Sequence, residues 1–144
     1  IPITQMQQHA VQESDLFGGP FTIVLVDDQE DSRDMLRMMF ESKNHVVFDG
    51  ADGGIAVQLI AKHKPHVAFI DIGLPVMNGF EVAQQIRQRK ELDGVLLVAL
   101  SGYGNHSDVA AALEAGFDEH ITKPAEFASL EQLLSRKRHS ELAG

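Results

Sequence analysis

The chain has 144 residues, no cysteine and a formal net charge of −9, from 12 Lys and Arg against 21 Asp and Glu. This length suits one domain with a core of ordinary size, and a second catalytic domain does not fit. The acidic balance argues against broad attraction to nucleic acid or an anionic membrane surface and favours cationic ligands, and the lack of cysteine excludes disulfides and thiolate metal sites.

The N-terminal segment predicts a linker, and the rest of the chain alternates between strands and helices. Residues 1–20 are rich in Gln, lack a clear period and end in the breaker cluster Gly18-Gly19-Pro20. Further along, short apolar runs predict strands, and apolar residues at helical spacing predict helices. The predicted strands are 21–26, 45–48, 66–72, 95–100 and 119–122, and the predicted helices are 30–42, 55–63, 78–90, 108–115 and 126–136.

No segment predicts a membrane or export signal. The longest apolar run, residues 95–100, is far shorter than the roughly 20 residues that span a bilayer. The first residues lack both the basic and the apolar region of a signal peptide. We therefore expect a cytoplasmic protein, with no membrane contact by this part of the chain.

The alternation predicts an α/β domain with a parallel sheet, right-handed crossovers and helices on both faces. In such sheets, ligands bind outside the carboxyl ends of the strands. Here those ends carry the pair Asp27 and Asp28, then Asp71, Ser101 and Lys123. Four strands are therefore predicted to deliver polar residues to one edge.

These residue types together describe a phosphoryl site. Three carboxylates at one edge repel one another, and a hard divalent cation with oxygen ligands relieves this. Mg²⁺ fits best, because it keeps waters and takes one or two carboxylates plus a phosphate oxygen. The Ser101 hydroxyl and the Lys123 ammonium supply a donor and a positive charge for an anion beside the metal. Taken one at a time, each residue could equally well be a polar side chain that faces water at the end of a strand.

The spaced motifs resemble the receiver domains of two-component response regulators over about residues 21–135. This resemblance implies a flavodoxin-like (βα)5 three-layer sandwich with a five-stranded parallel sheet of order 2-1-3-4-5. We assign residues 21–138 to the receiver domain and 139–144 to a C-terminal tail. The motifs are Asp27-Asp28, Asp71 with Pro75 four residues on, Asn78-Gly79, Ser101-Gly102 and Lys123-Pro124.

The resemblance implies a metal site. Asp28, Asp71 and the backbone carbonyl of Gly73 would bind Mg²⁺ or Mn²⁺ directly, and Asp27 would act through water. Because Gly73 lacks a side chain, it also offers no second acid of the kind that Asp-nucleophile phosphohydrolases carry at that position.

The resemblance also implies a phosphoryl-transfer role. Asp71 would be the phosphoacceptor, whose carboxylate attacks the phosphorus of a phosphohistidine. Lys123 would pair with the phosphoryl oxygens, and the Ser101 hydroxyl would turn toward them after transfer. His120 stands where receivers usually carry a switching Tyr or Phe. A cis bond is predicted between Lys123 and Pro124.

The phosphoryl donor would be a histidine kinase or a histidine phosphotransfer protein, because the chain carries no kinase motif of its own. The start at Ile1 and the motif Ser101-Gly102-Tyr103-Gly104 favour the interpretation that the chain is the C-terminal receiver of a hybrid histidine kinase. A stand-alone regulator is the alternative. Such a domain catalyses its own phosphorylation without being a turnover enzyme. A Mg²⁺-dependent phosphohydrolase, a flavin binder, a receiver used only as an interaction surface and a weak homodimer stay open.

Overall fold

The computed structural model describes residues 20–102 and 106–143, which contain one parallel sheet of five strands. The strand order is β2-β1-β3-β4-β5, so the predicted flavodoxin-like order is confirmed. Residues 1–19 and 103–105, which include most of the predicted linker and Tyr103, lie outside the described residues. The strands are β1 (Thr22–Val26), β2 (Val46–Gly50), β3 (Val67–Asp71), β4 (Leu96–Ser101) and β5 (Glu119–Thr122).

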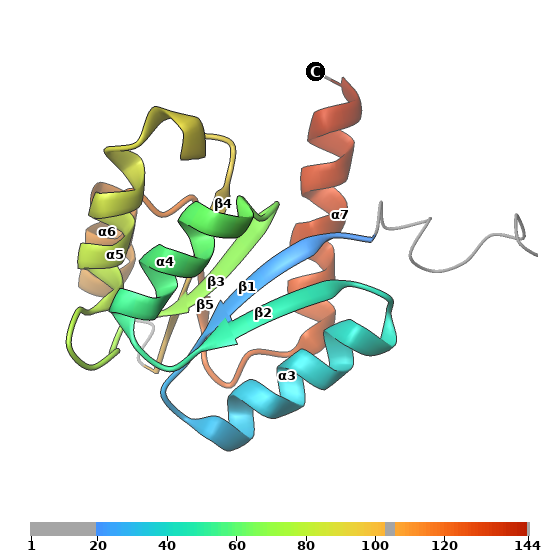
Figure 1. Cartoon of the computed structure of the whole chain (residues 1–144), viewed down its shortest axis with the longest axis horizontal. Coiled ribbons are helices and arrows are strands. Elements are labelled where there is room, and N and C mark those ends of the chain that lie inside the picture. Colours follow the sequence, from blue (N-terminus) through green and yellow to red (C-terminus); the bar gives the residue numbers. More distant parts are fainter. Residues whose placement is uncertain (1–19, 103–105, 144) are drawn as a thin grey trace, which may run out of the picture.

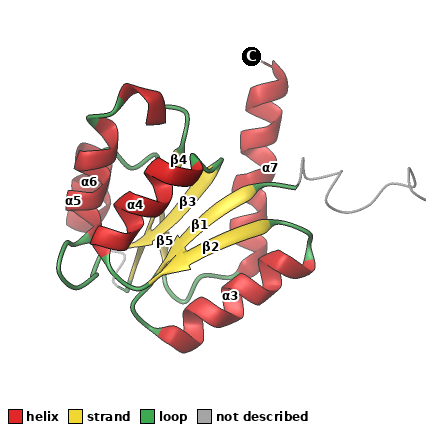
Figure 2. Cartoon of the chain, viewed as in Figure 1, coloured by secondary structure: helices red, strands yellow, loops and turns green. Residues whose placement is uncertain are grey.

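Helices cover both faces of the sheet (Figures 1 and 2). One apolar cluster joins one face of the sheet to α3 and α7, and a second joins the other face to α4, α5 and α6. The strands are thus buried between two helical layers, which explains why their sequences are nearly continuous apolar runs. The helices are α3 (Glu30–Ser42), α4 (Gly53–His63), α5 (Gly79–Arg87), α6 (His106–Ala115) and α7 (Phe127–Ala143), with a short 3-10 turn at Lys90–Leu92.

Most boundaries differ from the sequence prediction by one to three residues, and two differences change what a segment is. Asp49 and Gly50 are typical turn residues and were expected in a loop, but they end the edge strand β2, where they align with Leu25 and Val26. The predicted loop was wrong here because pairing with β1 outweighs local turn preference. At the other end, α7 continues to Ala143, so most of the segment predicted as a tail is helical.

Strand β3 lies between β1 and β4 and is buried along its whole length. Only backbone pairing and apolar contacts are available there to most of its residues, and Val67 to Ile70 are fully buried. Asp71 is the exception, because it is a carboxylate only 7% exposed at the end of this strand. A buried carboxylate requires compensating partners.

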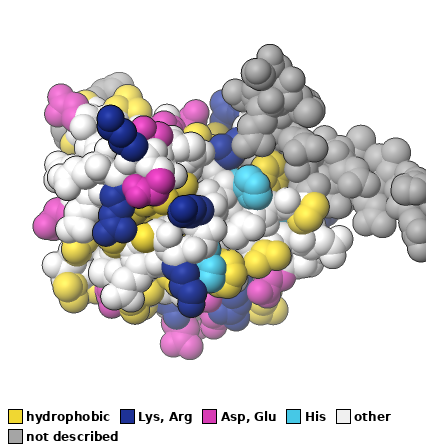
Figure 3. Space-filling model, turned by 45° about the horizontal axis from the view of Figure 1, so that its top comes forward, with side chains coloured by type: hydrophobic (Ala, Val, Ile, Leu, Met, Phe, Trp, Pro, Cys, Tyr) yellow, Lys and Arg dark blue, Asp and Glu magenta, His cyan; other side chains and the backbone are white. Residues whose placement is uncertain are grey.

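The described surface shows no continuous basic face in the view of Figure 3. Lys and Arg side chains are interspersed there with Asp and Glu. Among the described residues, no helix combines the length and the hydropathy needed to cross a membrane.

Two histidines hold the start of β1. The N–H of Phe21 donates to Nδ1 of His45 at 3.0 Å, and the N–H of Thr22 donates to Nδ1 of His66 at 2.9 Å. The Phe21 ring lies 5.6 Å from the His45 ring and 5.3 Å from the His66 ring, centroid to centroid. Both imidazoles must keep Nδ1 unprotonated to accept these bonds.

We expect His45 to make folding stability depend on pH. Burial lowers the pKa of His45, because it disfavours the charged imidazolium. Above about pH 6.5 the ring is neutral in both states; below it, the unfolded chain takes up a proton that the folded chain resists, so stability falls. His45→Asn keeps an acceptor near the Nδ1 position but cannot ionise. Urea unfolding at several pH values between 7.5 and 5 should show that the free energy of unfolding falls less for His45→Asn than for wild type. An equal fall in both proteins would contradict the expectation.

Candidate functional site

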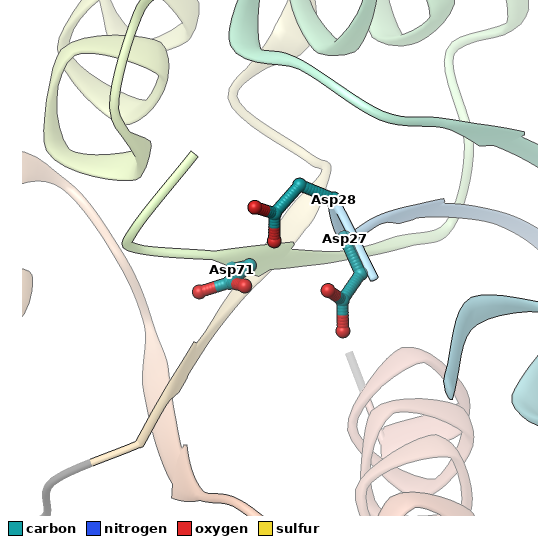
Figure 4. Close-up of side chains that lie close together, drawn as sticks. All are labelled: Asp27, Asp28 and Asp71. Carbon is teal, nitrogen blue, oxygen red and sulfur yellow. The ribbon is translucent and has the colours of Figure 1, made fainter. Parts of the chain in front are cut away.

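Three carboxylates meet at the carboxyl edge of the sheet, as predicted. Asp27 and Asp28 follow β1, and Asp71 ends β3, its neighbour in the sheet. Carboxylate oxygens of the three residues lie within 4.8 Å of one another. Figure 4 shows these side chains gathered at the two strand ends, with Asp28 extending toward Asp71. Asp27 and Asp71 are buried, whereas Asp28 is exposed.

Lys123 joins two of these carboxylates. Its Nζ lies 2.9 Å from Oδ2 of Asp71 and 3.0 Å from Oδ2 of Asp27. Burial alone would lower the pKa of Lys123, but the hydrogen bonds and negative charges of Asp71 and Asp27 outweigh it, and the pKa is raised. The lysine is therefore a charged group at neutral pH, and it offsets part of the repulsion among the carboxylates.

The donor set suits a hard divalent cation. All three clustered groups offer carboxylate oxygens, which Mg²⁺ and Mn²⁺ accept, and no soft ligand lies among them. Lys123 neutralises only part of three negative charges, so an attraction for a cation persists. The exposed Asp28 leaves one side of the cluster open to water, which a Mg²⁺ site usually retains.

The loop after β3 fixes the Asp71 carboxylate from the other side. The N–H of Gly73 donates to Oδ1 of Asp71 at 2.9 Å. The carbonyl of Gly73 as a metal ligand stays a prediction. Asn78 then caps α5, accepting from the N–H of Glu81 at 3.0 Å while Glu81 accepts from the N–H of Asn78 at 3.2 Å. This reciprocal capping box begins the helix directly beside the site.

Gly79 explains the second half of the Asn78-Gly79 motif. A Cβ placed on Gly79 would lie 2.8 Å from the carbonyl oxygen of Asp71 and 2.8 Å from Cα of Ile72. Both atoms belong to the backbone and cannot rotate away. The helix α5 therefore approaches the end of β3 more closely than any residue with a side chain allows.

Ser101 and His120 form a second pair at this edge. The Ser101 hydroxyl lies 2.7 Å from Nε2 of His120, and Ser101 is buried at the end of β4. The N–H of Lys123 donates to the carbonyl of Ser101 at 2.7 Å, so the backbone carrying the ammonium is fixed against the strand carrying the hydroxyl. The bond between Lys123 and Pro124 is cis, which confirms that prediction.

Two residues that the sequence analysis did not single out support the acidic pair. Nη1 of Arg33 donates to the backbone carbonyl of Asp27 at 2.7 Å, and its Nε donates to Oδ2 of Asp49 at 2.9 Å. Arg33 lies on the helix that follows Asp28, so its charge could have indicated a partner for the acidic pair. Asp49 gave no such signal, because its position in an Asp-Gly pair favoured a turn.

The family model of the response regulator receiver domain matches residues 23–135 of this chain. The chain belongs to this family. The matched range contains every residue of the carboxylate cluster together with Lys123, Ser101 and His120. The chain is therefore a receiver domain of two-component signalling, and the fold is the one predicted from the motifs.

Individual relatives agree with this assignment. The chain is 32% identical over 114 residues to an uncharacterized 14.6 kDa protein of Leptolyngbya boryana, covering 79% of this chain and 87% of that protein. It is 33% identical over 102 residues to the aerobic respiration control protein ArcA of Escherichia coli K12, covering 71% of this chain. The chain spans 42% of ArcA's length, so the activity of that whole protein is not carried over.

A solved structure shows the same architecture. The receiver domain of the sensor histidine kinase PA1611 from Pseudomonas aeruginosa PAO1 matches with a TM-score of 0.77 and 26% sequence identity. The match covers 84% of this chain and 99% of that one. That receiver holds a magnesium ion coordinated in its active site cleft.

We expect Gly79→Ala to destabilise the domain. Alanine would normally favour a helical position over glycine, but here its Cβ must displace backbone atoms of Asp71 and Ile72. Overpacking of this kind costs about 1–3 kcal/mol. Gly94→Ala is the matched control, because a Cβ there meets nothing within 4 Å. Urea unfolding of both variants measures the difference, and equal free energies of unfolding for Gly79→Ala and wild type would contradict the close approach.

Proposed function

We propose that this receiver accepts a phosphoryl group from a phosphohistidine onto Asp71, in a reaction that depends on Mg²⁺ or Mn²⁺. The observation that carries the proposal is the Lys123 ammonium, which lies 2.9 Å from Asp71 within an acidic cluster at the sheet edge. A carboxylate nucleophile, a fixed cation and oxygen ligands for a second cation are the parts that phosphoryl transfer requires. Asp28, Asp71 and the backbone carbonyl of Gly73 would bind the metal directly, and Asp27 would act through water.

The transfer step forms one bond and breaks one. A carboxylate oxygen of Asp71 attacks the phosphorus, the P–N bond of the phosphohistidine breaks, and the released imidazole nitrogen keeps the electron pair and takes a proton from solvent. Oδ1 of Asp71 already accepts from the N–H of Gly73, whereas Oδ2 faces Lys123. We assign the attack to Oδ2, because the new phosphoryl oxygens then form next to the ammonium.

Charge stabilisation comes from two sources. Lys123 exchanges its contact with Asp71 for contacts with the phosphoryl oxygens, while its contact with Asp27, at 3.0 Å, keeps it at the site. A bound Mg²⁺ supplies the remaining positive charge as a Lewis acid that neutralises phosphoryl oxygens. The chain positions these groups in advance, which is the main contribution a protein makes to this reaction.

An apolar cavity beside the site suits a protein donor. It has a volume of about 410 Å³ and lies between α3 and the segment that follows β5. Its apolar lining comes from Met35, Leu36, Leu100, Pro124 and Ala125, and its polar lining from Asp27, Gln29, Asp31, Ser32 and Lys123. A histidine kinase or histidine phosphotransfer protein that docks here would bring a phosphohistidine to Asp71, because apolar contact and the acceptor lie side by side. Placement in a hybrid histidine kinase, rather than in a stand-alone regulator, stays a prediction.

Phosphorylation at Asp71 has a direct test. Incubation with acetyl phosphate and Mg²⁺ should add one phosphoryl group to the chain, seen by intact mass. The adduct should be absent in Asp71→Asn, which lacks the nucleophilic oxygen, and absent when EDTA removes the metal. Asp93→Asn, at an exposed aspartate of the described chain, is the matched control and should react like wild type. An adduct of equal size in Asp71→Asn would refute the assignment.

The switch role of Ser101 and His120 has a separate test. The Ser101 hydroxyl can donate to a phosphoryl oxygen only if its 2.7 Å hydrogen bond with Nε2 of His120 is broken. A hydrogen bond contributes about 0.5–1.5 kcal/mol net, so His120→Phe should bind the phosphoryl mimic beryllofluoride about two- to tenfold more tightly in the presence of Mg²⁺.

Ser101→Ala is the partner control for this test. It removes the hydroxyl that would donate to the mimic, so beryllofluoride should bind more weakly. In the Ser101→Ala background, His120→Phe should then change the affinity little, because the contact is already lost. Titration by calorimetry measures all four proteins, and identical affinities of wild type and His120→Phe would remove His120 from the switch.

A further inference from the structure

The two peptide groups on either side of Asp27 are each held by one hydrogen bond, the one before it through the N–H of Asp27 and the one that leads to Asp28 through the carbonyl of Asp27. The N–H of Asp27 donates to the carbonyl of Gly50 at 3.1 Å. The carbonyl of Asp27 accepts from Nη1 of Arg33 at 2.7 Å. Because a peptide group is planar, fixing this carbonyl also fixes the direction in which the chain enters Asp28. The relative placement of the two neighbouring carboxylates therefore depends on Arg33.

Arg33 is itself held by the end of β2. Its Nε lies 2.9 Å from Oδ2 of Asp49, and the two side chains are only 15% and 23% exposed. Asp49 and Gly50 are the last two residues of that edge strand. Both contacts to the backbone of Asp27 thus come from one place, the first from Gly50 directly and the second from Asp49 through Arg33.

The hydrogen bond from Arg33 to the Asp27 carbonyl opposes one particular movement, in which the Asp28 carboxylate turns away from Asp71. The clustered oxygens of Asp27, Asp28 and Asp71 lie within 4.8 Å of one another, and like charges at this distance favour spreading apart. Asp27 is buried and tied to Lys123, so the exposed Asp28 is the group with room to move. Rotation of the peptide between Asp27 and Asp28 would carry the Asp28 carboxylate away from Asp71. The same rotation would break the charged hydrogen bond from Arg33 to the Asp27 carbonyl.

We propose that Arg33, oriented by Asp49, is a positioning residue that holds the acidic pair in a geometry ready for the metal. The inference rests on the magnesium site proposed above and extends it, because it assigns a role to a cation that touches no metal ligand side chain. The edge strand β2 is then part of the metal site, although none of its residues is a ligand.

A purely electrostatic role and a positioning role predict opposite changes in Mg²⁺ affinity when Arg33 is replaced. A positive charge near the cluster repels Mg²⁺, so its removal alone should strengthen metal binding. If Arg33 positions the ligands, its removal should weaken binding. Loss of a group that orients metal ligands typically costs 10- to 100-fold in affinity, and we expect roughly tenfold here.

Arg37 offers the matched control. It shares Oδ2 of Asp49 at 3.2 Å and also contacts Asp34 at 2.9 Å, so it carries the same charge in the same network. In the part of the chain that the structure describes, the ion pairs of Arg37 reach Asp34, Glu41 and Asp49, and none of these belongs to the acidic pair. Arg37→Met should therefore report the charge effect without the positioning effect.

The experiment measures Mg²⁺ affinity of the full 144-residue chain by titration calorimetry. Arg33→Met should bind roughly tenfold more weakly than wild type, while Arg37→Met should bind as tightly as wild type or more tightly. Arg33→Lys keeps the charge, but one ammonium cannot donate along both of the guanidinium's directions, so it too should bind more weakly. Thermal unfolding without metal establishes that each variant is folded; if Arg33→Met is not, Arg33→Lys carries the test.

Each outcome has one meaning. Unchanged or tighter binding by the folded Arg33 variants overturns the inference, as does an equal loss in Arg37→Met. Failure of the wild-type chain to bind Mg²⁺ is a distinct result, because it overturns the metal site itself and the inference with it. Weaker binding confined to the Arg33 variants supports the positioning role.

Discussion

The arrangement of this receiver depends on the contact of one ammonium with two buried carboxylates. Parallel strands β1 and β3 end at the same edge of the sheet, so Asp27 and Asp71 are forced together by the backbone. Their repulsion would oppose folding if it were not compensated. Lys123 lies about equally far from both, at 3.0 and 2.9 Å, and it arrives from the end of β5 at the far side of the sheet. The site is therefore assembled by the whole sheet.

The remaining contacts refine this central one. Gly73 and Arg33 each donate a hydrogen bond to an aspartate of the cluster, to the Asp71 carboxylate and the Asp27 carbonyl respectively. Gly79 allows α5 to begin against the backbone of Asp71. Each contact orients an oxygen and leaves the charge of the cluster in place. The cluster thus keeps a net negative charge with its oxygens in fixed positions, and a bound cation would reduce the repulsion among them.

The sequence predicted the layers and the site well, for physical reasons. Apolar runs between turn residues located the strands. Because the carboxyl ends of parallel strands lie at one edge of the sheet, the sequence alone grouped Asp27, Asp28, Asp71, Ser101 and Lys123. Asp49 escaped prediction, because its pairing with β1 is a long-range contact that local residue preferences do not encode. The contact between Ser101 and His120 was likewise a matter of side-chain direction across two strands, which strand assignment leaves undetermined.

The uneven burial of the three carboxylates affects how fast the site fills. Asp27 and Asp71 are enclosed, but Asp28 faces solvent, so a cation meets its first protein oxygen without any opening of the domain. If the site binds Mg²⁺ as proposed, the slow step of loading would be the loss of water from the ion, because Mg²⁺ gives up its water reluctantly. Ions that shed water faster would enter the same site sooner. The chemistry of the cation would then set the rate of metal exchange at the proposed site, and the protein would determine where the cation binds.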